Sequence, residues 1–157
     1  MSNIRLFFSK VLSVGMIGNL DKSQSHYLMK VMRIKENEVF SLFNKNGEWE
    51  AKIFNLSKSI VEFKITKQLR KKENIKDLWL AFSPIKSNYL NFMIQKSTEL
   101  GITKFLPIIF DRTIVRKINI ERLQKIIIEA SEQSNQINIP SIAPVSYTHL
   151  TLPTTTI

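Results

Sequence analysis

Cysteine is absent from the 157 residues, and glycine occurs only four times. Without cysteine the chain can form no disulfide, iron–sulfur cluster, cysteine-ligated zinc site or thiol nucleophile, which is typical of a reducing compartment. The glycines match neither a phosphate-binding loop nor a dinucleotide-binding fingerprint; they are Gly15, Gly18, Gly47 and Gly101. The sequence therefore excludes the chemistries that depend on those motifs.

Histidine and long apolar segments are also scarce. A histidine-based metal site would have to combine His26 or His149 with carboxylates from distant segments, and we expect no metal. No apolar run approaches the ~20 residues of a membrane helix, and the first residues lack the charged-then-apolar order of a signal peptide. We expect a cytoplasmic protein without a membrane partner.

Positive charge, in contrast, is abundant. The chain has 23 Lys and Arg against 13 Asp and Glu, and residues 1–72 carry 14 of the basic side chains with 6 acidic ones. This concentration favours nucleic-acid binding by the first half, because neutralising phosphates releases counterions. A solvated basic face is the alternative, and coding rich in A and T would also produce an excess of lysine.

Residues 1–70 have the pattern of a small β-barrel. The strand-like segments are rich in β-branched and aromatic residues and span 4–8, 38–43, 48–54 and 59–65. Asn and Gly in segment 44–47 favour a hairpin loop. One helix interrupts the series, capped by Asp21 or Ser23. The expected barrel would hold most of the basic charge.

Residues 78–145 have the pattern of an α/β layer. The apolar runs 78–82 and 105–110 are typical of strands buried on both faces. A helix follows each run, and Ser87 or Asn88 would cap the first helix. Strand–helix–strand–helix predicts parallel strands, but two strands make only half of a sheet.

Two segments lie outside these domains. Residues 71–77 are polar and predict a linker. Residues 146–157 contain five threonines and no charge, and their amino-acid sequence resembles a translated sequencing adapter. We expect this tail to be foreign, although an ordinary threonine-rich terminus is the alternative.

One group of candidate site residues lies in the first half. Arg5 belongs to the first strand, while His26, Lys30 and Arg33 fall at i, i+4 and i+7 of the expected helix. One helix face would then present an imidazole and two cations, which can bind phosphate or ribose. A solvated helix face carries the same residue types.

The second half offers five candidates for a cleft: Lys86, Glu99, Arg112, Glu129 and Gln133. Lys86 precedes a helix, where backbone N–H groups add to its charge. Arg112 and Arg116 follow the second strand, at the sheet edge where ligands usually lie. Each of these residues could also be an ordinary surface residue, and none forms a strong motif by itself.

The order of these motifs, however, resembles one known family. The matching segments are RLF at 5–7, HYLMKVMR at 26–33, QKSTELGI at 95–102, Pro107, Arg112-Thr113 and EASEQS at 129–134. Over residues 4–145 the chain resembles the bacterial 16S ribosomal RNA uridine-N3 methyltransferases, the E-type small-subunit methyltransferases of the SPOUT class.

The resemblance implies a PUA-like β-barrel followed by an α/β SPOUT domain, whose trefoil knot binds S-adenosylmethionine. It also implies a homodimer acting on 16S ribosomal RNA in the small subunit. Arg5, His26 and Arg33 would face RNA, with Lys30 and Arg116 as further RNA-binding candidates. The five cleft candidates would belong to the catalytic domain.

Two departures from the family limit this reading. The family usually has Arg shortly after its Glu–Gln pair, where this chain has Asn135-Gln136, and nothing after residue 145 corresponds to the knot. We therefore expect the α+β barrel and only the first half of the SPOUT domain, with no cofactor-binding residues. The chain would be an inactive fragment, and no residue is an evident base for the uridine N3 proton. The alternatives are a non-catalytic RNA-binding module and a PUA-type domain of another RNA-modifying activity.

Overall fold

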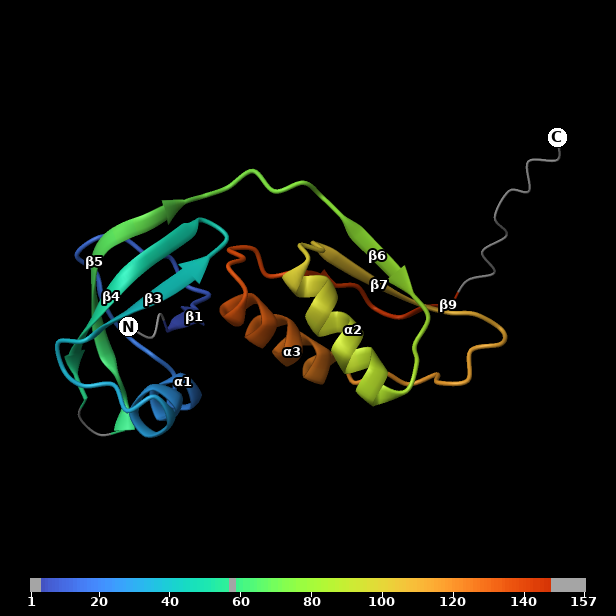
Figure 1. Ribbon diagram of the computed structural model, residues 1–157, viewed down its shortest axis with the longest axis horizontal. Coiled ribbons are helices and arrows are strands. Elements are labelled where there is room, and N and C mark those ends of the chain that lie inside the picture. Colours follow the sequence, from blue (N-terminus) through green and yellow to red (C-terminus); the bar gives the residue numbers. More distant parts are fainter. Residues whose placement is uncertain (1–3, 57–58, 148–157) are drawn as a thin grey trace. The chain divides into compact units, whose positions relative to one another are not determined.

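The computed structural model describes residues 4–56 and 59–147. The chain divides between Asn74 and Ile75 into two compact units, called unit 1 and unit 2 below (Figure 1). None of the described helices is both long enough and apolar enough to span a bilayer.

Unit 1 is built on a mixed sheet with the strand order β1-β3-β4-β5-β2. Its strands are β1 (Arg5–Phe7), β2 (Ile17–Asn19), β3 (Val39–Asn44), β4 (Gly47–Asn55) and β5 (Glu62–Lys71). β1 runs parallel to β3, and the other pairs are antiparallel. In the described residues β1 and β2 stand at the two edges and do not pair, so the sheet is open where the sequence predicted a closed barrel. The helical segment supplies fully buried Leu28 to the core that packs against this sheet.

The β3–β4 hairpin confirms the turn predicted at residues 44–47. The Asn44 side-chain oxygen accepts a hydrogen bond from the Asn46 N–H at 2.9 Å, and Gly47 has φ 147°. A Cβ atom at Gly47 would clash with the carbonyl oxygen of Arg70, so the close approach of β5 requires glycine there. β5 continues to Lys71, well beyond the predicted end at residue 65, because its last residues pair with the start of β4.

The helical segment of unit 1 has two parts. α1 (Lys22–His26) begins at Asp21, one of the two caps that the sequence predicted, whose carboxylate accepts a hydrogen bond from the Gln24 N–H at 2.7 Å. η1 (Tyr27–Val31) is a π-helix, which the sequence did not predict. Arg33 lies beyond it with a left-handed φ of 53°.

Unit 2 is a parallel α/β layer, in agreement with the predicted strand–helix–strand–helix order. Its elements are β6 (Trp79–Phe82), α2 (Ser87–Glu99), β7 (Lys104–Ile109), α3 (Ile120–Gln133), β8 (Ser141–Ile142) and β9 (Ser146–Tyr147). Central β7 pairs with β6 on one side and with β8 and β9 on the other. β9 contains the first two residues of the segment expected to be foreign, and residues 148–157 of that segment lie outside the described residues.

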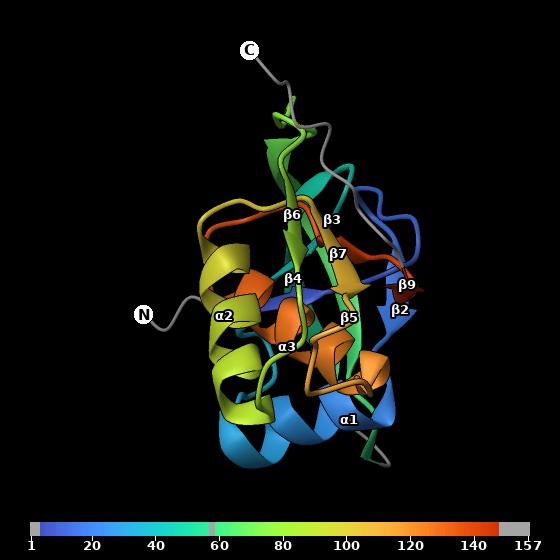
Figure 2. The same ribbon diagram turned by 90° about the vertical axis from the view of Figure 1, so that its right-hand side faces the viewer.

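The strands of unit 2 are buried on one face only, so the prediction of burial on both faces was wrong. Both helices pack on the same side of the sheet (Figures 1 and 2). One core cluster joins Phe82 and Phe105 to side chains of α2 and α3. On the opposite face Trp79 is 54% exposed. The apolar runs were read correctly as strands, but periodicity cannot show on which side the helices return.

Candidate functional site

Unit 1 presents an exposed imidazole and two exposed cationic side chains around its helical segment. His26 ends α1, Lys30 lies in η1, and Arg33 follows the Met32 C-cap; all three are exposed. The expected i, i+4, i+7 face of a regular α-helix is not formed, because a π-helix intervenes and Arg33 lies outside it. π-Helical segments are rare and often occur at functional sites.

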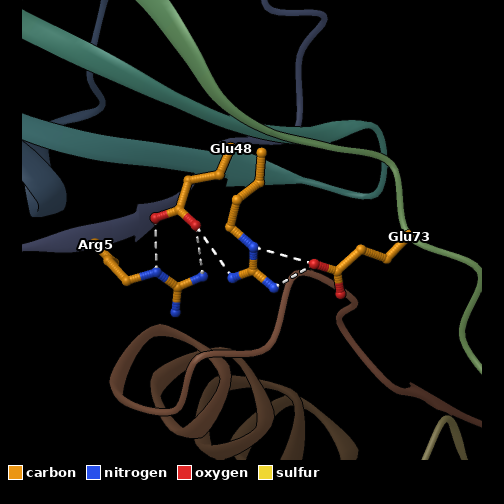
Figure 3. Close-up of polar contacts among 4 residues, drawn as sticks. Arg5, Glu48 and Glu73 are labelled. Carbon is orange, nitrogen blue, oxygen red and sulfur yellow. Dashed lines mark hydrogen bonds and ion pairs between the residues drawn. The ribbon is translucent and has the colours of Figure 1, made fainter.

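Arg5 has a different setting from these exposed residues. Its Nε donates to Glu48 Oε1 at 2.8 Å, and the two side chains are only 7% and 5% exposed (Figure 3). The guanidinium carbon lies 4.4 Å from the centroid of the Phe43 ring. Arg70 Nη1 contacts the other Glu48 oxygen at 3.3 Å, and Arg70 Nη2 donates to Glu73 at 2.7 Å. In this conformation Arg5 is a structural ion-pair partner and does not present its charge to phosphate.

The strand register shows basic residues that the sequence analysis missed. Lys52 of β4 lies directly opposite Lys64 of β5, and the row continues to exposed Val39 and Ile17 on the flanking strands. Like charges in directly opposed positions destabilise a sheet unless a counter-charge is present. Exposed Phe54 follows Lys52 by two residues and shares its face. The alternation of residues 51–54 could have placed Lys52 and Phe54 outward, but only the register places Lys64 beside them.

In unit 2, the loops after β6 and β7 meet at the carboxyl edge of the sheet. The Ser83 and Thr113 hydroxyls are hydrogen-bonded at 2.9 Å. Lys86 is the exposed N-cap of α2, a position predicted for Ser87 or Asn88.

The two arginines of the β7–α3 loop complete this edge. Arg112 is exposed in the loop. Arg116 Nη2 donates a hydrogen bond to the Asp111 carbonyl at 2.8 Å, which orders the loop. Lys86, Arg112 and Arg116 therefore make this edge cationic.

The five cleft candidates do not come together in one place. Lys86 and Glu99 lie at opposite ends of α2, about 20 Å apart at 1.5 Å per residue. Glu99 pairs with Lys96 at 2.9 Å, and its carbonyl accepts a hydrogen bond from the Gln136 side chain at 3.3 Å. Glu129 and Gln133 belong to the last turns of α3, away from Arg112. Sequence order could not reveal this separation, because it depends on the direction in which both helices return.

A groove of about 580 Å³ separates the solvent-facing sides of α2 and α3. From α2 it is lined by Asn88, Asn91, Phe92 and Gln95. From α3 the polar lining residues are Arg122, Lys125, Glu129 and Gln133, with Ile126 and Ala130 between them. The groove therefore brings together two of the five cleft candidates, Glu129 and Gln133, with amides that the sequence analysis had not selected.

A small polar cluster lies at the start of β6 and β7. Asp77 Oδ1 accepts a hydrogen bond from the Thr103 hydroxyl at 2.6 Å, and Lys104 Nζ lies 4.5 Å from the Trp79 ring centroid. The hydrogen bond from Thr103 and, to a smaller extent, one from Trp79 hold the pKa of the Asp77 carboxyl below its ordinary value. Among the described residues no three His, Cys, Asp or Glu side chains gather in a metal-binding group.

Comparison with known families identifies both halves of the chain. Residues 71–154 match the family described as RNA methyltransferase domain, and residues 20–66 match the RNA methyltransferase PUA domain. The first match continues into the segment that was expected to be foreign.

Curated relatives and solved structures give the same result. Ribosomal RNA small subunit methyltransferase E of Rickettsia conorii is 40% identical over 118 residues, which cover 74% of this chain and 48% of the relative. The protein of the same name from Buchnera aphidicola of Acyrthosiphon pisum is 31% identical and is covered over 58% of its length. The chain thus spans about half of the length of these curated relatives.

Two of the similar solved structures contain the same bound molecule. The small subunit methyltransferase E of Neisseria gonorrhoeae, bound to S-adenosylmethionine, superposes with a TM-score of 0.82 at 30% identity over 92% of this chain and 62% of that one. A protein of Legionella pneumophila in complex with the same cofactor has a TM-score of 0.79 at 27% identity, over 94% and 64%.

Proposed function

The chain belongs to the RNA methyltransferase family that includes the small-subunit methyltransferases E, and from this premise we propose that it acts on 16S ribosomal RNA of the small subunit. The proposed reaction transfers a methyl group from S-adenosylmethionine to N3 of one uridine. A homodimer and a cytoplasmic location, both implied by the resemblance, belong to the same proposal.

The observation that carries the proposal is the exposed positive charge of unit 1. Lys30, Arg33, Lys52 and Lys64 are exposed, and all four lie within the match to the RNA methyltransferase PUA domain. The opposed pair Lys52–Lys64 is unfavourable in the free protein and becomes favourable beside a phosphate chain. We therefore assign the first contact with RNA to unit 1, including exposed His26.

Methylation at N3 also requires removal of a proton, because this nitrogen carries a proton in uridine. Its removal leaves negative charge on the uracil ring, which nearby cations stabilise. Lys86 and Arg112 lie at the carboxyl edge of the parallel sheet, where ligands of α/β proteins bind. We propose that these side chains offer charge to the uracil oxygens. We assign no proton acceptor to the described residues.

The family resemblance implies glycine-rich loops around the cofactor, and the described residues of unit 2 do not supply such loops. Residues 75–147 contain one glycine, Gly101, which ends α2 at the edge opposite to Lys86. The loops at the carboxyl edge therefore contain no glycine that would let their backbone come close to a ligand. We propose that the cofactor site requires residues beyond those described, and that this chain alone does not transfer methyl groups.

Methyl incorporation tests the proposal directly. The chain is incubated with labelled S-adenosylmethionine and small subunits that lack the modification. A chimera is tested beside it, in which residues 1–145 are followed by the remaining length of the Rickettsia conorii relative. We expect no incorporation with the chain and incorporation with the chimera, and nucleoside mass spectrometry should identify 3-methyluridine.

Each of the other outcomes contradicts a stated part of the proposal. Incorporation by the chain alone would show that the cofactor site is present. Methylation of another base by the chimera would refute the assignment to uridine N3. Tight small-subunit binding without any methylation by a folded chimera would favour the non-catalytic RNA-binding module.

A further inference from the structure

We propose that the groove between α2 and α3 is a second RNA-binding site, which takes an unpaired nucleotide by its base and its phosphate. The inference rests on the proposed action upon RNA, but its residues belong neither to the PUA domain nor to the cationic group Lys86, Arg112 and Arg116 at the carboxyl edge. A volume of about 580 Å³ lies within the range of small-ligand sites.

Two stripes of side chains at helical spacing form the groove. On α2 the stripe follows i, i+3, i+4 and i+7, from Asn88 to Gln95. On α3 it runs from Arg122 to Gln133, which is about 16 Å at 1.5 Å per residue. Both helices return from parallel strands and run in the same direction, so their amino-terminal ends lie at the same end of the groove.

The amide side chains of the groove are free to bind a ligand. Within the described part of the chain, Asn88, Asn91, Gln95 and Gln133 have no side-chain hydrogen bond to another residue. Each amide offers both a donor and an acceptor, the combination that reads the edge of a nucleobase.

Charge is distributed unevenly along the groove. Arg122 and Lys125 have no ion-pair partner within the described residues, and Arg122 lies in the first turn of α3, where the helix dipole also favours an anion. Glu129 lies one turn beyond Lys125, and its carboxylate disfavours phosphate but accepts hydrogen bonds from a base amino group. Phosphate therefore fits the amino-terminal end, and the base fits the carboxyl-terminal end.

Phe92 gives the groove an aromatic surface between these two ends. Its side chain is 61% exposed although it lines the groove. Unpaired bases stack on such rings, whereas bases within a duplex cannot reach them. The expected ligand is therefore single-stranded RNA rather than a helix.

The test uses the full chain and a short fluorescent single-stranded RNA that contains 4-thiouridine. Phe92→Ala should weaken binding about 5- to 150-fold, the effect of losing one stacked base. Tyr89→Ala is the matched control, because Tyr89 is 62% exposed on the same helix and does not line the groove; it should change affinity less than about twofold. Photocrosslinks should map to residues 87–99 or 120–133.

Salt dependence supplies an independent measurement. Arg122→Gln should reduce the slope of log affinity against log salt by about 0.7, the value for one phosphate on a single strand. Lys117→Gln, an exposed cation outside the groove, should leave the slope unchanged. Circular dichroism melts confirm that each variant is folded.

The outcomes separate this inference from the proposed function. Equal effects of Phe92→Ala and Tyr89→Ala, or crosslinks confined to residues 20–66, would overturn the groove assignment and leave RNA binding by unit 1 intact. No RNA binding by the wild-type chain would refute both. A groove variant that changes sedimentation but not RNA affinity would assign the groove to a second copy of the chain and overturn the proposal.

Discussion

Glu48→Gln should destabilise unit 1 severely, because it leaves the Arg5 guanidinium without its anionic partner in a buried site. The Arg5 and Glu48 side chains are 7% and 5% exposed and are joined at 2.8 Å. Removing one partner of such a pair costs about 3–5 kcal/mol. Glutamine keeps the shape and an acceptor, so we expect about 3 kcal/mol. For a domain of this size the corresponding fall in Tm is at least about 12 °C.

The assay can use fluorescence, because each unit contains one tryptophan, Trp49 and Trp79. Urea unfolding in a Trp79→Phe background follows buried Trp49 alone. Glu50→Gln is the matched control on the same strand: Glu50 pairs with Lys67 at 3.6 Å, and the Lys67 side chain is 62% exposed. Its loss should cost less than about 1 kcal/mol.

A further variant distinguishes burial of charge from loss of packing. Arg5→Met combined with Glu48→Leu should recover most of the lost free energy, since apolar replacement of a buried pair is often neutral or stabilising. The folded double variant should keep its RNA affinity, because Arg5 does not present its charge to solvent. Equal destabilisation by Glu48→Gln and Glu50→Gln would refute the reasoning, and a large loss of RNA affinity in the folded Arg5 variant would restore Arg5 as an RNA contact.

Three further predictions concern charge, acid and cleavage. Replacing both Lys52 and Lys64 by Gln should reduce the slope of log RNA affinity against log salt by about 1.4 on a single strand, as fluorescence titration can show. The same change should slightly raise the stability of unit 1, as melting can show. An unchanged slope would contradict a phosphate contact by these lysines. Because the pKa of Asp77 is lowered in the folded state, its carboxylate stabilises unit 2 above pH 3.8, and this stabilisation is lost as the pH falls through the pKa of the folded state. Asp77→Asn should therefore flatten the acid limb of the stability curve that Trp79 fluorescence reports. An unchanged acid limb would show that the Thr103 hydrogen bond contributes nothing to stability. Limited trypsin digestion should cut first within residues 72–78, which form no helix or strand. The cleavage should leave unit 1 folded and unit 2 prone to aggregate. A single cooperative unfolding transition for the whole chain would argue against two units of different stability.

Features that depend on neighbouring residues were predicted well from the sequence. Asp21 was one of two expected caps, with Ser23, and does cap α1, because its carboxylate needs only an N–H three residues away. The Asn44–Gly47 turn likewise follows from the residues it contains. The alternation of strand and helix in unit 2 also reflects local pattern.

Features that depend on distant partners could not be predicted. β2 (Ile17–Asn19) has three residues and exists because β5 pairs with it. Arg5 resembles an ordinary surface cation until Glu48, in a different strand, is placed beside it. The two-sided burial expected for Trp79 failed for a similar reason, since no local pattern tells which face a helix covers. The groove between α2 and α3 needed both helices in position before its amides could be seen together.

The strand order of unit 1 also constrains when this unit can fold during synthesis. β2 is made early, but its partner β5 is not complete until Lys71 has been added. Residues 75–147 then require about 4–15 s of translation at usual rates, whereas small domains rich in non-local strand pairs fold in about milliseconds to seconds. Unit 1 therefore has time to complete its sheet before unit 2 has been synthesised. The exposed lysines of a finished unit 1 would then be available to RNA while the apolar strands of unit 2 are still being made.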